Sequence, residues 1–141
     1  MTIRPYAADD IDEVLDVWLR ASRIAHHFLS DEFFAQEESE VRETWMTIAD
    51  TYVYEHQGKV VGFIAMLENE VGAIFVDPGH QGFGIGRALM DTAREIRPFL
   101  ELTVFEANDT GRGFYQAYGF VEIGRSVHEA TGQAEIRMRL D

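Results

Sequence analysis

Cysteine is absent from the 141-residue chain, and this absence excludes disulfide bonds and thiolate metal sites. Positive charge is scarce: 12 lysines and arginines stand against 25 acidic residues, which gives a formal net charge of -13. Binding to nucleic acid depends on clustered lysine and arginine, so this balance argues against a nucleic-acid partner. An acidic surface keeps a protein in solution and also attracts cationic ligands, and both interpretations remain open.

Long hydrophobic runs are also missing. The longest, residues 60–67, has the length of a strand and falls well short of the roughly 20 residues that a membrane-spanning helix needs. The N-terminal residues lack the basic flank and apolar stretch of a signal peptide. We therefore expect no membrane partner and a cytoplasmic location. With 46% hydrophobic residues, no repeat and no linker, residues 1–141 are expected to form a single domain.

The alternation of hydrophobic and polar residues predicts a mixed α/β fold. Helices are expected from Asp9 or Asp10, from Asp31 to about Met46, from Gly84 to Ile96, and from Asp109 or Thr110 to Gly119, with Asn108 as a turn or cap residue before the last. Residues 57–59 are expected to form a hairpin turn. Strands are expected at residues 2–5, 52–54, 60–66, 71–76, 100–105, 120–127 and 134–140. This order favours an α+β fold with a mixed, mostly antiparallel central sheet of six to seven strands and helices on both faces.

A glycine-rich loop is the most informative segment. Gly82, Gly84 and Gly86 lie between a strand and a helix, at alternate positions. Without side chains, backbone N–H groups can approach an anion closely, and the helix dipole favours negative charge there. The loop therefore predicts a phosphate or pyrophosphate site. Dinucleotide-binding loops have two residues between their last two glycines, whereas this chain has one residue between Gly84 and Gly86. Triphosphate-binding loops need lysine followed by serine or threonine, whereas this chain has Arg87 and Ala88. Neither of these two loop types therefore matches the sequence.

Two blocks of the sequence carry a resemblance to a known family. The first is Gln81-x-x-Gly84-x-Gly86, preceded by Val76-x-Pro78, and the second is Asn108 followed by Phe114-Tyr115-x-x-x-Gly119-Phe120. Together, in this order and separation, they resemble the acetyl-coenzyme A signature of the GNAT (GCN5-related) N-acetyltransferase superfamily, in its small, single-domain bacterial form. The resemblance implies transfer of an acetyl group from acetyl-coenzyme A (acetyl-CoA) to a small-molecule or peptide amine. A non-catalytic acyl-CoA-binding module on the same fold is the alternative.

The resemblance also implies which residues hold the co-substrate. The pantetheine arm is expected in a gap between the strand at residues 74–76 and the strand at residues 102–105, with the pyrophosphate on the loop. Arg87 either contacts phosphate or points to solvent. The expected cofactor-binding residues are Ile74, Phe75, Val76, Gln81, Gly82, Phe83, Gly84, Ile85, Gly86, Arg87, Asn108 and Tyr115.

Catalytic roles follow from the same resemblance. Tyr115 is expected to act as the general acid that protonates the CoA thiolate, although helical spacing alone favours a core aromatic. The base is expected to be His27 or Glu70, because the strand at residues 71–74 lacks an acid. His27, Phe28 and Phe33 are expected to border the acceptor. The histidines show no metal-ligand spacing, so no metal is expected. The sequence leaves open whether the protein is a monomer or a homodimer.

Overall fold

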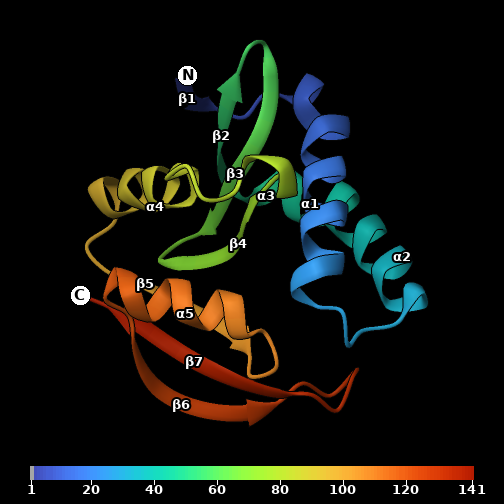
Figure 1. Ribbon diagram of the computed structural model, residues 1–141, viewed down its shortest axis with the longest axis vertical. Coiled ribbons are helices and arrows are strands. Elements are labelled where there is room, and N and C mark those ends of the chain that lie inside the picture. The colour runs from blue at the N-terminus through green and yellow to red at the C-terminus, as the bar shows by residue number, and fades with distance from the viewer. Residues whose placement is uncertain (1) are drawn as a thin grey trace.

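Seven strands form one sheet in the computed structural model, which describes residues 2–141 (Figure 1). Their order is β1-β2-β3-β4-β5-β7-β6, and every neighbouring pair is antiparallel except β4 and β5. The strands are β1 (Thr2–Pro5), β2 (Asp50–His56), β3 (Lys59–Leu67), β4 (Glu70–Val76), β5 (Leu100–Phe105), β6 (Val121–Val127) and β7 (Ala134–Leu140). The predicted mixed, mostly antiparallel sheet is thus confirmed.

Helices cover both faces of this sheet, as the sequence predicted. The helices α1 (Ile11–Ala25) and α2 (Asp31–Glu40) pack on one face, whereas α4 (Ile85–Ile96) and α5 (Asp109–Tyr118) lie on the other (Figure 1). Each face therefore has its own hydrophobic core, because the apolar stripe of each helix is removed from water against the strands. The core below α1 includes Val14, Trp18, Val53 and Phe63, and the core below α4 includes Ile64, Leu89, Met90 and Leu102.

One predicted helix needs a correction. The segment expected to run from Asp31 to about Met46 is divided into α2, a π-helical turn η2 (Val41–Trp45) and the short helix α3 (Met46–Ile48). The wider turn changes the direction in which the side chains at its end point, and the ring of Trp45 comes to rest over Gly72 of β4. A Cβ atom at Gly72 would lie 2.9 Å from that ring. Such turns are frequent at functional sites, and this one sets a cavity wall described below.

The sheet opens between its two parallel strands. β4 and β5 are paired only at Glu70 and Glu101, and their register continues no further. Beyond this point the strands diverge, so the backbone of residues 71–76 has no strand partner on the β5 side. The gap that was predicted between residues 74–76 and 102–105 is present.

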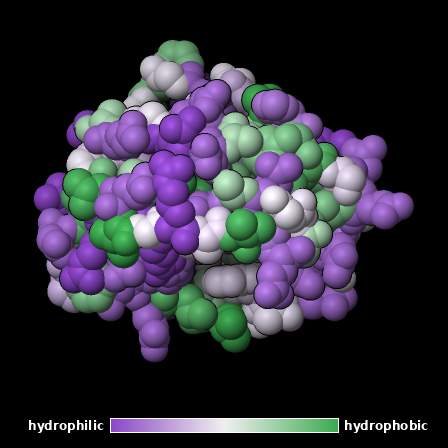
Figure 2. Space-filling model, turned by 90° about the horizontal axis from the view of Figure 1, so that it is seen from below, coloured by the Kyte–Doolittle hydropathy of each residue, from purple (hydrophilic) through white to green (hydrophobic). Residues whose placement is uncertain are grey.

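The other end of the sheet is the edge strand β6. None of its residues is buried, and three of its apolar residues, Val121, Ile123 and Val127, are exposed. Figure 2 views the molecule from below, on the side of β6 and β7, and shows hydrophobic residues in separate groups among hydrophilic ones. Scattered apolar groups of this kind are ordinary for a protein surface.

Candidate functional site

A cavity of about 850 Å³ opens where β4 and β5 diverge. This volume lies in the range of small-molecule sites. The wall brings together eleven of the twelve residues that the sequence predicted to hold the co-substrate: Ile74, Phe75, Val76, Gln81, Gly82, Gly84, Ile85, Gly86, Arg87, Asn108 and Tyr115. The twelfth, Phe83, is 79% exposed and is not on the wall.

The glycine loop forms one end of the cavity. Gly82 and Gly84 have φ angles of +86° and +83°, in the left-handed region that glycine adopts without strain. Gly84 is the N-cap of α4, and within residues 2–141 the backbone N–H groups of residues 82–87 donate no hydrogen bond. Free N–H groups at a helix N-terminus suit an anion. A Cβ atom at Gly82 or Gly84 would meet nothing within 4 Å, so backbone conformation, not crowding, requires glycine at both positions.

A buried aspartate holds the start of this loop. Asp77 accepts hydrogen bonds from Gly79 N at 3.1 Å and from His80 Nδ1 at 2.8 Å, and it forms an ion pair with Arg20 of α1. Although burial opposes it, these partners lower the pKa of Asp77 below its ordinary value. The turn η3 (Pro78–His80) is therefore held against α1, and this contact fixes the position at which the glycine loop begins.

Among residues 2–141, Arg87 is the one lysine or arginine on the cavity wall. Its guanidinium carbon lies 5.3 Å from the centre of the Tyr118 ring, and the Tyr118 hydroxyl donates a hydrogen bond to Asp91 at 2.5 Å. The stacked ring restrains an otherwise exposed side chain beside the free N–H groups of the loop. The site thus adds one permanent positive charge to a row of backbone donors.

Asn108 joins the strand β5 side of the cavity to α1. Its carboxamide oxygen accepts a hydrogen bond from Gly111 N at 2.9 Å and so caps α5, as the sequence predicted. Its amide nitrogen lies 3.4 Å from Nε2 of His26, whose Nδ1 lies 3.0 Å from Ser22 Oγ. Burial lowers the pKa of His26 to about 4, so this ring is neutral at pH 7 and is a weak proton acceptor.

Tyr115 is placed by α5 in the same wall. Its ring packs between Phe114 and Phe120, with ring centres 5.6 and 5.8 Å away, and part of its surface remains open to the cavity. Within residues 2–141 the hydroxyl has no hydrogen-bond partner. Burial raises the pKa of Tyr115 to about 12, so the hydroxyl keeps its proton at neutral pH. Tyr115 therefore lines the cavity as a protonated phenol.

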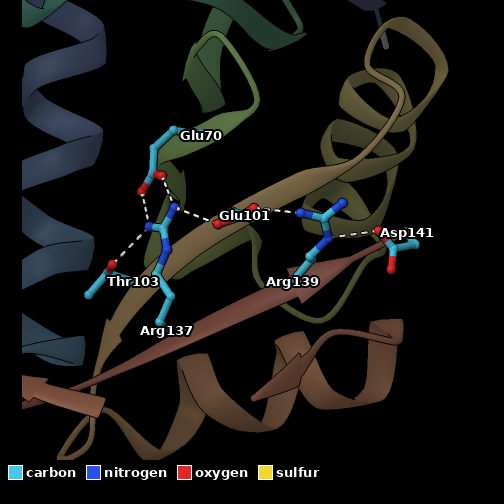
Figure 3. Close-up of polar contacts among 6 residues, drawn as sticks. All are labelled: Glu70, Glu101, Thr103, Arg137, Arg139 and Asp141. Carbon is cyan, nitrogen blue, oxygen red and sulfur yellow. Dashed lines mark hydrogen bonds and ion pairs between the residues drawn. The ribbon is translucent and has the colours of Figure 1, made fainter. Parts of the chain in front are cut away.

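The structure does not bring Glu70 to the cavity. Arg137 of β7 donates to both of its carboxylate oxygens, at 2.5 and 2.7 Å, and also to Glu101 at 3.0 Å (Figure 3). Arg139 extends the network by donating to Glu101 at 2.8 Å. Glu70 lies at the closed end of the β4–β5 pair, and its charge is neutralised there.

The predicted acceptor residues are only partly gathered. Phe33 lines the cavity, whereas His27 and Phe28 do not. His27 is exposed, and Phe28 packs edge-on against His26 and Phe105. At the end of α1 the neighbouring His26 occupies the cavity wall instead, with its ring 5.3 Å from that of Phe105.

Several further cavity residues were not predicted as site residues. Glu37 and Trp45 reach the wall from α2 and η2, and His128 and Glu135 reach it from the end of β6 and from β7. These positions lie far apart in the sequence, and the signal for them was weak: Glu37 belongs to a run of acids that is typical of a solvated helix face. Within residues 2–141, no group of three or more metal-binding side chains is present, and no helix has the length and apolar character to cross a membrane.

Comparison with known proteins gives consistent matches. Residues 47–122 match the family profile of the acetyltransferase (GNAT) domain. Peptidyl-lysine N-acetyltransferase YiaC of Escherichia coli (strain K12) is 32% identical over 119 residues, which cover 84% of this chain and 82% of that protein. Peptidyl-lysine N-acetyltransferase YjaB of the same organism is 31% identical over 134 residues, which cover 94% of this chain and 90% of that protein.

Solved structures agree with these matches. The solution structure of the apo form of Escherichia coli YjaB superposes with a TM-score of 0.87 at 30% identity and covers 98% of this chain and 95% of its own. The PaiA N-acetyltransferase of Thermoplasma acidophilum, solved in complex with coenzyme A, superposes with a TM-score of 0.80 at 17% identity, with 99% of this chain and 98% of its own covered. The second likeness concerns the fold alone.

Proposed function

Because this chain belongs to the GNAT acetyltransferase family, we propose that it transfers the acetyl group of acetyl-CoA to the side-chain amine of a lysine in a peptide or protein. The family and the acyl donor are the premise, since GNAT enzymes use acetyl-CoA. The observation that supports the proposal most directly is the single cavity that joins the glycine loop, the β4–β5 gap and Tyr115.

The donor half of this cavity fits acetyl-CoA. The pyrophosphate is assigned to the free N–H groups of residues 82–87 and to Arg87, which offset the negative charge of the rest of the molecule locally. The pantetheine arm is assigned to the gap, where the edge of β4 at residues 74–76 has no strand partner on the β5 side and faces its amides. This places the thioester deeper in the gap, toward Tyr115 and Asn108.

The reaction is a direct transfer between two bound substrates. The acceptor ammonium first loses one proton, and the neutral nitrogen then attacks the thioester carbon. The C–N bond forms, the C–S bond breaks, the sulfur leaves with the electron pair of that bond, and the nitrogen gives up its second proton to solvent. We assign to Tyr115 the proton that reaches the sulfur, which leaves as the CoA thiol, and solvent returns a proton to the phenol. The net change is one amide, one thiol and one released proton.

No base among the predicted candidates fits this geometry. His27 and Glu70 lie off the wall, and the lowered pKa of His26 makes it a weak acceptor of protons. Gly72 and Thr103 are cavity residues with exposed surface, so this end of the cavity is open to water. We therefore assign the departing ammonium proton to water at the open end and not to a side chain.

The proposal is tested first by binding and then by turnover. We expect acetyl-CoA to raise the melting temperature, with ATP and NAD as controls that do not. We then expect thiol release with lysine-containing peptides, and mass spectrometry should find the acetyl group on the lysine side chain. Acetyl-CoA binding without thiol release on any peptide or small amine would instead support a non-catalytic acyl-CoA-binding module.

A further inference from the structure

The cavity has a second half, which the donor does not need. Across the gap from α4, its wall is formed by Phe33 and Glu37 of α2, by Trp45 of η2 and by His128 and Glu135. This wall lies on the α1–α2 side of the sheet, whereas the glycine loop and Tyr115 belong to the α4–α5 side. An acceptor that enters from the α1–α2 side thus reaches the gap opposite the donor.

The carboxylate of Glu37 lies on this wall without a partner among residues 2–141. It is half-buried, yet within residues 2–141 it forms neither a hydrogen bond nor an ion pair with its side chain. Three other acids that are at least partly buried have arginine partners: Glu70 and Glu101 bind Arg137, and Asp77 binds Arg20. A half-buried carboxylate that is left without a cation is unfavourable, and a cationic ligand relieves that cost.

The surroundings of Glu37 favour a positive ligand. Burial is the main cause that raises the pKa of Glu37, and the negative charge of the nearby Glu40 raises it further, whereas His128 lowers it. Glu135 adds a second carboxylate to the same half of the cavity, and Phe33 and Trp45 add aromatic surface. Carboxylates among aromatic rings are suited to an ammonium on an alkyl chain.

We propose that Glu37 is the carboxylate that captures and orients the ammonium group of the acceptor, and that Phe33 and Trp45 enclose its alkyl chain. This inference rests on the proposed acetyl transfer and specifies the acceptor as a cationic alkyl amine of the lysine type. Glu37 acts in the capture of the cation, before the proton leaves and the nitrogen attacks. Removal of its charge therefore weakens acceptor binding more than it slows the chemical step.

The test is Glu37→Gln, with Glu38→Gln as the matched control. Glu38 lies on the same helix, carries the same charge and is also half-buried, but it is not on the cavity wall. We expect Glu37→Gln to raise KM for a lysine peptide by about ten- to a hundred-fold, as for loss of a hydrogen bond to a charged group, with a smaller change in kcat. Titration calorimetry of the peptide against the CoA complex should give the same ratio of Kd values. Equal effects of the two substitutions, or no effect of either, would overturn the inference.

A second substrate separates charge recognition from general damage. The aminooxy analogue of lysine has nearly the same shape but is uncharged at neutral pH. Wild-type enzyme should bind the lysine peptide more tightly than the aminooxy peptide, and Glu37→Gln should remove most of that difference. If the variant loses affinity for both peptides equally, Glu37 shapes the pocket and does not read the charge.

Failure of the inference differs from failure of the proposed function. If acetyl transfer itself is wrong, wild-type protein releases no thiol with any lysine peptide. If only the role of Glu37 is wrong, wild-type and Glu37→Gln proteins both transfer acetyl groups with the same KM. An unchanged KM for acetyl-CoA in the variant confirms that the donor half is intact.

Discussion

At the scale of single residues, burial raises the pKa of Tyr115 and so keeps its hydroxyl protonated. A phenol with a pKa near 12 is fully protonated at neutral pH, whereas a thiol has a reference pKa of about 8.5. The phenol is therefore the weaker acid, and in the proposed mechanism it stabilises the leaving sulfur by a hydrogen bond before any proton crosses. This stabilisation is greatest as negative charge develops on sulfur, so it belongs to the transition state and not to the bound substrates.

We expect Tyr115→Phe to lower kcat by about a hundred- to ten-thousand-fold, the range typical of general acids, while Kd for acetyl-CoA stays near normal. Tyr118→Phe is the control, because its hydroxyl binds Asp91 of α4 and Tyr118 is not on the cavity wall. Steady-state kinetics with a lysine peptide and calorimetry with CoA give the two quantities. If kcat is unchanged while chemistry limits the rate, the donor is another group.

His26 predicts a pH dependence of stability. Its pKa is about 4 in the folded protein and near the reference value of 6.5 in the unfolded chain, so the unfolded state binds more protons between these values. The contribution of the neutral ring is complete above pH 6.5 and is lost as the pH falls toward 4, by up to about 3 kcal/mol. We expect urea unfolding to show a shallower pH slope in His26→Gln than in wild type over this window. The exposed His27→Gln is the control and should keep the wild-type slope; a slope unchanged in both variants would contradict the assignment.

At the scale of elements, the glycine loop depends on backbone conformation. Gly84 has a φ of +83°, and an alanine there is strained by about 1–2 kcal/mol even though its Cβ has room. We expect Gly84→Ala to raise Kd for acetyl-CoA by about tenfold or more, because relief of the strain turns the N–H groups of the loop away. Thermal shift and calorimetry measure this change.

Gly113→Ala is the matched control for Gly84→Ala. Gly113 lies inside α5, its φ is outside the left-handed region, and an added Cβ meets nothing within 4 Å. Alanine in a helix interior is more stable than glycine by about 0.5–1 kcal/mol, so this variant should gain stability and keep its affinity. A Kd within a factor of about two of wild type in Gly84→Ala would refute the role of the loop.

The elements that the sequence predicted well are those fixed by local signals. The helix α5 ends at Gly119 with a φ of +124°, the β2–β3 hairpin turns at Gln57 and Gly58, and Asn108 caps a helix, each as expected from the residue type. The β4–β5 gap followed from the family resemblance. The π-helical turn η2 was missed because no local residue pattern distinguishes it from an α-helix, and the packing of Trp45 on Gly72 is a contact between distant segments.

The site was harder to predict where tertiary contacts decide. Glu70 was a reasonable base candidate until its partner was known, and that partner, Arg137, lies 67 residues later. His26 and His27 are adjacent in the sequence, but the last turn of α1 directs only the first into the cavity. Glu37 belongs to an acidic run, and helix periodicity alone does not tell which of its carboxylates meets a cavity that is formed mostly by other elements.

At the scale of the whole molecule, almost all basic residues are arginines. Lys59 is the single lysine of the sequence, and the remaining basic residues of the 12 are arginines. Within residues 2–141, every ion pair uses arginine or histidine, and the network of Glu70, Glu101, Arg137 and Arg139 is an example (Figure 3). Guanidinium stays protonated at any physiological pH, so it is not a nucleophile toward a thioester, unlike the amine of lysine. The arginines that form the ion pairs of this protein are therefore not acetylated by the acetyl-CoA that it uses.

This composition leads to a test of the intact protein. After long incubation with acetyl-CoA, intact-mass analysis should find side-chain acetylation at Lys59 at most, and the melting temperature should not change, because Lys59 is exposed in the β2–β3 hairpin and holds no ion pair within residues 2–141. Arg137→Lys is the informative comparison, since it places an acetylatable amine between Glu70 and Glu101. Acetylation of that lysine would remove its charge and leave Glu70 unpaired, whereas Glu101 would keep Arg139, so the melting temperature of the variant should fall as the modification proceeds. Loss of stability in the wild-type protein under the same treatment would contradict the argument, because Lys59 would then hold a structural contact that the arginines were expected to supply.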